Sequence, residues 1–237
     1  MNLGERMKRY EFVTRNYLTC KTPVIVRIDG KAFHTFTKGL EKPYDKQLMR
    51  LMQDTTLKLC KEVDGCKMGY TQSDEISLLI TDWENIDTQA WFQNNLSKII
   101  SVTASIATLE FNKNLLLLAL CGEDPIWEEK TMKALFDSRA FNLPKEEVCN
   151  YFIWRQQDAT RNAIQLVGQS NFSHNQLQGK TCNQIQEMLF QEKEINFNDF
   201  PATFKRGICV IKENGKWIID KEIPIFTQER EYIERFL

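Results

Sequence analysis

The sequence has few of the residues that usually build zinc sites. Only two histidines occur, His34 and His174, and none of the seven cysteines forms a C-x-x-C pair. Zinc sites are built from cysteine and histidine ligands at short spacings. A zinc site is therefore not expected, and sites in which oxygen atoms bind a hard cation become the main alternative. The odd, scattered cysteines also fit reduced thiols better than a disulfide framework.

The chain also lacks an excess of charge, a secretory leader and a membrane-length apolar run. Its 31 Lys and Arg against 32 Asp and Glu leave a net charge of −1, so any contact with nucleic acid must come from a local basic patch. The charged stretch 5–9 has no apolar segment behind it, which argues against a signal peptide. The apolar run 115–120 is far shorter than the roughly 20 residues that span a bilayer. We expect a cytoplasmic protein that does not bind membranes.

The hydrophobic pattern predicts one α+β domain over residues 1–237. With 237 residues and 42% hydrophobic content, the chain can bury one sizeable core, and it contains no repeat or Pro/Gly-rich linker. Periodicity and turn signals predict strands at 24–28, 76–80 and 134–141, helices at 48–63, 88–112 and 144–168, a helix capped by Thr181 and Gln184, and a hairpin turning at Asn214-Gly215. The stretch 113–133 supports no assignment beyond a turn at Asp124-Pro125.

Two short acidic segments, V24-I-V-R-I-D-G30 and S73-D-E-I-S-L-L-I80, are the most informative part of the sequence. Two-metal phosphoryl transfer needs carboxylate oxygens held on rigid elements, and strand ends supply that rigidity. The two strands are expected to be neighbours, so Asp29 and Asp74 can converge. Asp74 and Glu75 would point to opposite faces of a regular strand, so either the chain bends there or only one of them binds metal directly. We favour Asp74 as the direct ligand. The structural alternative is an ordinary turn followed by an exposed strand start.

A single charge interrupts the apolar stripe of the predicted helix 144–168. Arg155 lies on this stripe, and an unpaired buried charge is expensive. Asp158, three residues further on, offers a structural ion pair. A contact with a phosphate group is the other interpretation, and the sequence leaves both open.

Several segments, in one order along most of the chain, resemble tRNA-His guanylyltransferase and its relatives, the 3′-to-5′ nucleotide-adding polymerases. These segments are R27-I-D-G-K-A-F-H34, E41-K-P-Y-D45, G69-Y-T-Q-S-D-E75, F136-D-S-R139, Y151-F-I-W-R-Q-Q-D158, L177-Q-G179, E187-M-L-F190, I195-N-F-N198 and F204-K-R-G207. Each segment alone is a weak signal, whereas the ordered series is specific.

The resemblance implies a palm-like antiparallel sheet flanked by helices, as in polymerase and nucleotidyl-cyclase palms. The palm-like core would cover about 1–142, and a helical and C-terminal hairpin extension about 143–237. The implied enzyme is a nucleotidyltransferase that acts on the 5′ end of tRNA. ATP or GTP would activate a 5′-monophosphate as an adenylylated or guanylylated intermediate, and a nucleoside triphosphate would then be added. The family tends toward tetramers, so a homo-oligomer is expected.

The resemblance also assigns roles to individual residues. Two Mg²⁺ ions would be held by Asp29, Asp74 and the Gly30 carbonyl, with Glu75 as a supporting or water-bridged ligand. The residues implied in nucleotide binding are Arg27, Gly30, Lys31, Ala32, Phe33, His34, Lys42, Asp45, Ser73, Lys98 and Asn162, and those implied in RNA binding are Arg155, Lys205 and Arg206. Simpler alternatives stay open: core packing for Phe33, a helix cap for Asp45, and solvated charges for Arg27 and Lys98.

Two departures from the family pattern bear on the reaction. Thr160 stands where the eukaryotic enzymes have a histidine, and Ile185 stands where the family has a lysine. They favour the bacterial or archaeal-type relatives, which resemble template-dependent polymerases that repair 5′-truncated tRNA. The alternatives are untemplated guanylyl addition to tRNA-His, a cyclase-like enzyme that uses nucleoside triphosphates without RNA, and a non-catalytic tRNA-binding module.

Overall fold

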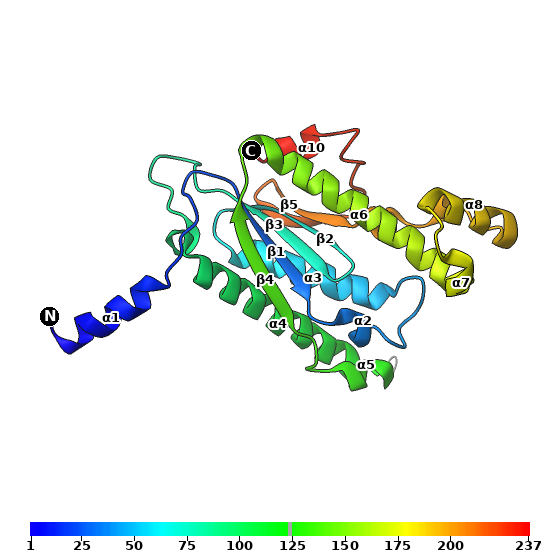
Figure 1. The fold of residues 1–237 in the computed structure, drawn as a ribbon, viewed down its shortest axis with the longest axis horizontal. Coiled ribbons are helices and arrows are strands. Elements are labelled where there is room, and N and C mark those ends of the chain that lie inside the picture. The colour runs from blue at the N-terminus through cyan, green and yellow to red at the C-terminus, as the bar shows by residue number, and fades with distance from the viewer. Residues whose placement is uncertain (123–124) are drawn as a thin grey trace.

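A six-stranded antiparallel sheet forms the centre of the molecule (Figure 1). The structure is a computed structural model and describes residues 1–122 and 125–237. The strand order is β4-β1-β3-β2-β5-β6. The strands are β1 Val24–Gly30, β2 Cys66–Gln72, β3 Glu75–Ile80, β4 Phe136–Asn142, β5 Ile208–Glu213 and β6 Lys216–Asp220. The C-terminal hairpin thus joins the same sheet as the N-terminal strands.

Helices cover both faces of this sheet. α3 (Lys46–Glu62) and α4 (Leu96–Leu120) pack on one face, and α6 (Lys145–Asn171) crosses the other (Figure 1). The α1 helix extends away from the sheet and buries none of its residues. The shorter elements are α1 Leu3–Val13, α2 Phe33–Phe36, α5 Pro125–Lys130, α7 His174–Leu177, α8 Cys182–Lys193, α9 Ala202–Arg206, α10 Glu231–Glu234, and the 3₁₀ turns η1 Trp91–Asn94 and η2 Phe197–Asp199.

The alternation of side chains along β1 determines which face carries polar groups. Val24, Val26 and Ile28 belong to the core under α3 and α4, whereas Ile25 belongs to the core under α6. Successive side chains of a strand point to opposite faces, so Arg27 and Asp29 share the α6 face with Ile25. The polar end of β1 therefore faces α6.

The structure confirms much of the predicted secondary structure. The α+β class is confirmed, β1 and β3 are neighbours, and β5 and β6 form the hairpin around Asn214-Gly215. The Thr181–Gln184 capping box opens α8. Among the described residues, no helix is long and apolar enough to span a bilayer.

Three parts of the secondary structure were predicted wrongly or not at all. The helix predicted over 88–112 begins only at Leu96, because Phe92 and Gln93 have positive φ angles that an α-helix cannot include. Strand β2 was not predicted. The unassigned stretch 113–133 contains the end of α4 and all of α5, while the predicted turn at Asp124 lies outside the described residues.

Candidate functional site

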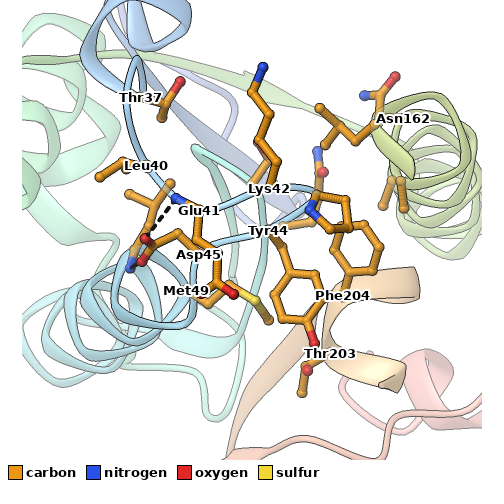
Figure 2. A pocket seen from close by; sticks show the side chains of 17 residues that line it. Thr37, Leu40, Glu41, Lys42, Tyr44, Asp45, Met49, Asn162, Thr203 and Phe204 are labelled. Carbon is orange, nitrogen blue, oxygen red and sulfur yellow. Dashed lines mark hydrogen bonds between the residues drawn. The ribbon is translucent and has the colours of Figure 1, made fainter. Parts of the chain in front are cut away.

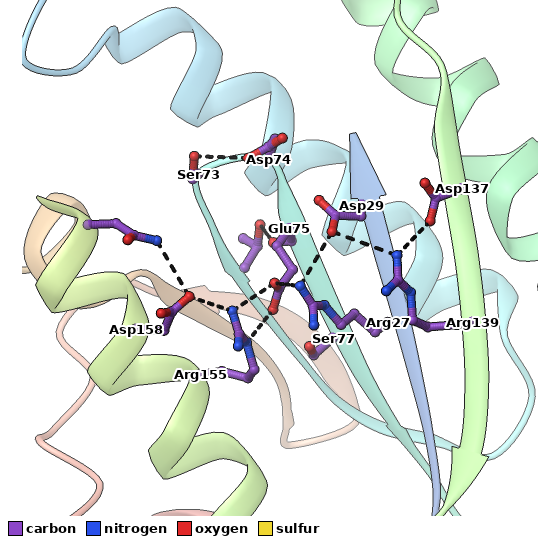
Figure 3. A network of polar contacts seen from close by, with 12 residues as sticks. Arg27, Asp29, Ser73, Asp74, Glu75, Ser77, Asp137, Arg139, Arg155 and Asp158 are labelled. Atoms are coloured by element: carbon purple, nitrogen blue, oxygen red, sulfur yellow. Dashed lines mark hydrogen bonds and ion pairs between the residues drawn. The ribbon is translucent and has the colours of Figure 1, made fainter. Parts of the chain in front are cut away.

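The end of β1 and the tight turn between β2 and β3 bring Asp29 and Asp74 to one end of the sheet (Figure 3). The Gly30 amide donates a hydrogen bond of 3.0 Å to the Asp74 carbonyl oxygen, which joins the two segments. The Ser73 hydroxyl, from a residue with φ of 50°, lies 3.1 Å from Asp74 Oδ1. Burial and the nearby Asp29 carboxylate raise the pKa of Asp74. The predicted convergence of these two segments is therefore present.

This pair of carboxylates fits the ligand preference of magnesium. The Asp74 carboxylate is partly buried and lies near the negative charge of Asp29, and both effects disfavour its ionised form. A bound cation would offset both effects. Within residues 1–122 and 125–237, no three or more Asp, Glu, His or Cys side chains group as a metal site. Magnesium usually takes only one or two protein carboxylates and completes its shell with water and substrate phosphates. Two carboxylates are therefore a sufficient protein contribution.

Glu75 belongs to a different arrangement, on the face of the sheet that α6 covers. Arg155 Nε and Nη2 donate to Glu75 Oε1 and Oε2 at 2.7 and 2.9 Å, and Arg27 Nη2 lies 2.7 Å from Oε2 (Figure 3). Burial raises the pKa of the Glu75 carboxyl, while the two guanidiniums act in the opposite direction. With both cations in contact, the carboxylate is the form that the geometry supports.

Arg155 is 3% exposed, and its partners are acidic side chains. Besides Glu75 it contacts Asp158 Oδ2 at 2.8 Å, so the ion pair considered in the sequence is present. Burial acts to lower the pKa of Arg155, but Glu75 and Asp158 outweigh it and raise that pKa. A contact with RNA would require these bonds to break, so the predicted RNA-binding role of Arg155 does not fit this arrangement.

Two arginines flank Asp29, and one of them was not predicted. Arg27 Nη2 lies 3.4 Å and Arg139 Nη2 lies 3.9 Å from Asp29 Oδ2. Arg27 and Arg139 are directly opposite each other on β1 and β4, where like charges repel. Asp29 and Asp137, the latter 3.0 Å from Arg139, offset that repulsion. The two-residue alternation of side chains along β4 could have predicted that Arg139 shares the α6-covered face of the sheet with Arg27.

The turn after β1 supplies backbone donors next to Asp29. Within the described residues, the amides of Gly30 and Lys31 donate to the carbonyls of Asp74 and Leu135, whereas no backbone acceptor takes those of residues 32–34. Phe33 is buried against Phe36, which fits the core-packing interpretation. A Cβ on Gly30 would lie 2.3 Å from the Phe33 ring, so this position requires glycine.

A cavity of about 200 Å³ opens beside the Ser73 turn (Figure 2). Four predicted nucleotide-binding residues line it: Lys42, Asp45, Ser73 and Asn162. Asp45 also caps α3, accepting from the amides of residues 47 and 48 at 2.9 and 3.0 Å, so the capping interpretation holds as well.

Two aromatic residues of this cavity were not predicted. Tyr44 stacks on Phe204 of α9 with ring centroids 4.5 Å apart, which gives the cavity a flat aromatic wall (Figure 2). The two residues are far apart in the sequence, so no local spacing could have shown the stack.

The structure does not bring the remaining predicted residues into the cavity. Lys98 is exposed near the start of α4, with its ammonium 5.7 Å from the Phe92 ring centroid. Lys205 donates to the Asn198 carbonyl at 2.6 Å, and burial together with Arg206 lowers its pKa. Exposed Lys31 lies on the turn that follows β1, and exposed His34 lies in the short helix α2.

Thr160, which departs from the family pattern, ties two helices together. Its hydroxyl donates to the carbonyl oxygens of Gln156 at 3.1 Å and Lys205 at 3.0 Å. The contact joins α6 to α9 beside the cavity wall. Thr160 therefore has a structural role here.

Comparison with known proteins gives consistent matches along the chain. The family model described as tRNAHis guanylyltransferase matches residues 4–144, and the model described as Thg1 C terminal domain matches 146–234. A bacterial tRNA(His) guanylyltransferase-like protein in complex with ATP is 49% identical, with a TM-score of 0.92 and 99% of both chains covered. A bacterial tRNA(His) guanylyltransferase-like protein in complex with GTP is 44% identical, with a TM-score of 0.80 and the same coverage. The tRNA(His) guanylyltransferase of Schizosaccharomyces pombe is 30% identical over 88% of this chain and 80% of its own length.

Proposed function

The chain belongs to the tRNAHis guanylyltransferase family, a family of nucleotidyltransferases, and from this premise we propose that it is a magnesium-dependent, template-dependent polymerase that repairs 5′-truncated tRNA in the 3′-to-5′ direction. The observation that carries the proposal is the pair Asp29 and Asp74, held together beside a turn with open amides and beside the cavity that Lys42, Ser73 and Asn162 line. Fold alone would not support this activity, because one fold serves many reactions.

The reaction would take place in two phosphoryl transfers. In the first, an oxygen of the tRNA 5′-monophosphate attacks the α-phosphorus of ATP or GTP, and pyrophosphate leaves. In the second, the 3′-hydroxyl of an incoming nucleoside triphosphate attacks the activated 5′-phosphate, and AMP or GMP leaves. Such transfers depend mainly on positioning and on the neutralisation of charge.

The residues at the sheet end are suited to that positioning. The amides of residues 32–34 would donate to phosphate oxygens, and Tyr44 and Phe204 would hold the activating base against the cavity wall. Lys42 would place a cation beside the polyphosphate, and Asp29, Asp74 and the Gly30 carbonyl would hold magnesium. Bound magnesium would offset the negative charge of the reacting phosphates.

Two features support repair over untemplated guanylyl addition. Thr160 and Ile185 occupy positions where the eukaryotic enzymes or the family have a histidine and a lysine, and Ile185 is buried under α6. The two solved structures at 49% and 44% identity are bacterial and hold different purine nucleotides. The same resemblance suggests a cytoplasmic homotetramer, which light scattering of the purified protein would test.

The test is incubation with magnesium, ATP, GTP and the four nucleoside triphosphates on a 5′-monophosphorylated tRNA that lacks its first nucleotide. Extension by one nucleotide is expected, and Asp29→Ala and Asp74→Ala should abolish it. Asp137→Ala, which removes a nearby exposed carboxylate of β4, is the matched control and should retain extension. Nucleotide turnover that ignores RNA would instead indicate a cyclase-like enzyme, and magnesium-independent tRNA binding without extension would indicate a binding module.

A further inference from the structure

A continuous series of charged contacts runs from α6 to the end of β1 (Figure 3). Arg155 holds both oxygens of Glu75 at 2.7 and 2.9 Å. Oxygen Oε2 of Glu75 also contacts Arg27 Nη2 at 2.7 Å, and the same Nη2 lies 3.4 Å from Asp29 Oδ2. Each side chain in the series is therefore in contact with the next one. The series ends at Asp29, a proposed metal ligand.

Arg27 depends on this series for its position. Its Nε atom is buried and has no hydrogen-bond partner among the described residues. Its recorded ion pairs are made by Nη2, with Glu75 and Asp29. Because arginine has many rotamers, a guanidinium anchored at one end needs a fixed partner there. Arg155 provides that fixed partner by clamping Glu75 with two parallel bonds, an arrangement that adds geometric precision as well as energy.

We propose that Arg155 is a positioning residue of the nucleotidyl transfer site, which acts through Glu75 to hold Arg27 where it can bind the polyphosphate of a nucleotide. The inference rests on the proposed function, and it assigns to α6 a task beyond packing. Residues 4–144 match one family model and residues 146–234 match the other. The contact between Arg155 and Glu75 therefore joins the two regions of the chain that these models match. The C-terminal part would thus set the geometry of the catalytic carboxylate face.

The test measures nucleotide binding separately from catalysis. Isothermal titration calorimetry with ATP in EDTA gives the dissociation constant without metal or RNA, and steady-state extension gives KM and kcat for the added nucleotide. Arg155→Met should raise the dissociation constant for ATP and the KM for the added nucleotide, each by about tenfold, the typical strength of one charge-assisted contact. Arg161→Met is the matched control: this α6 arginine also pairs with Asp158, but it is exposed and has no recorded contact with Glu75.

Two further variants separate positioning from charge and from general destabilisation. Arg155→Lys keeps the positive charge but cannot clamp both Glu75 oxygens, so it should weaken ATP binding nearly as much as Arg155→Met. It also serves if Arg155→Met does not fold. The double variant Arg27→Met/Arg155→Met should bind ATP no worse than Arg27→Met alone, because Arg155 acts through Arg27.

Three results would overturn the inference. The first is wild-type ATP affinity in Arg155→Lys, and the second is an ATP affinity in the double variant that falls by the product of the two single-variant losses. The third is an equal loss of ATP affinity in Arg161→Met and Arg155→Met. These outcomes are read from ATP binding and do not need tRNA extension. A protein that binds ATP with the expected pattern but does not extend tRNA would contradict the proposed reaction and leave the role of Arg155 supported.

Discussion

Replacing Asp74 by asparagine should remove the response of the protein's stability to magnesium without destabilising the metal-free fold. Burial and the Asp29 carboxylate raise the pKa of Asp74 above that of an ordinary aspartate. The folded state therefore binds this proton more tightly than the unfolded state. The ionised Asp74 carboxylate therefore lowers the free energy of unfolding of the metal-free protein at neutral pH. That lost stability is regained as pH falls through the raised pKa and Asp74 is protonated. Asparagine has the same shape without the charge.

The size of the magnesium effect follows from binding linkage. At a magnesium concentration ten times its dissociation constant, one bound ion stabilises the fold by about 1.4 kcal/mol, which raises the Tm of a chain of this size by roughly 3–6 °C. Wild type should show this rise between EDTA and magnesium at pH 7.5. Asp74→Asn should show little of it, with a Tm in EDTA equal to or above that of wild type.

The assay is differential scanning calorimetry in EDTA and in magnesium. Asp137→Asn is the control, because Asp137 lies opposite Asp29 on β4 and pairs with Arg139. That variant should keep the full magnesium response. The reasoning is refuted if Asp74→Asn keeps the wild-type response to magnesium, or if it melts several degrees lower in EDTA.

Three other substitutions probe the surroundings of the site. Tyr44→Ala removes the ring that stacks on Phe204, so the KM for the activating nucleotide should rise about tenfold in steady-state extension assays, while kcat changes little. Gly30→Ala places a Cβ 2.3 Å from the ring of Phe33 and should abolish extension, and a variant that extends at the wild-type rate would show that the turn tolerates the clash. Thr160→Val removes a hydrogen bond to α9, so urea unfolding should show a loss of about 1 kcal/mol, with unchanged extension.

The sequence predicted the parts of the site that depend on local patterns. A β-branched run followed by Asp29-Gly30, and a second apolar run after Ser73-Asp74, were enough to place two carboxylates on neighbouring strands. Strand alternation does not describe Asp74 and Glu75, because Asp74 lies in the turn before β3 and the strand begins only at Glu75; the chain bends there. Strand β2 was missed because its residues, C-K-M-G-Y-T-Q, include a glycine and polar residues that do not alternate clearly.

The parts that could not be predicted depend on contacts between distant residues. Helix spacing pointed from Arg155 only to Asp158, whereas its bidentate partner Glu75 is 80 positions away. The pairing became visible only once β3 and α6 were packed together. Tyr44 and Phe204 likewise meet across the cavity without any shared local pattern.

The most direct test of the account is to change the template and follow the product. Two 5′-monophosphorylated tRNAs that lack the first nucleotide would differ only in the 3′-strand base opposite the gap, and both would be incubated with magnesium, ATP and all four nucleoside triphosphates. The account predicts that the added nucleotide changes to remain complementary to that base, and that Asp29→Ala adds none. Addition of guanosine to both substrates, whatever the opposing base, would contradict template-dependent repair.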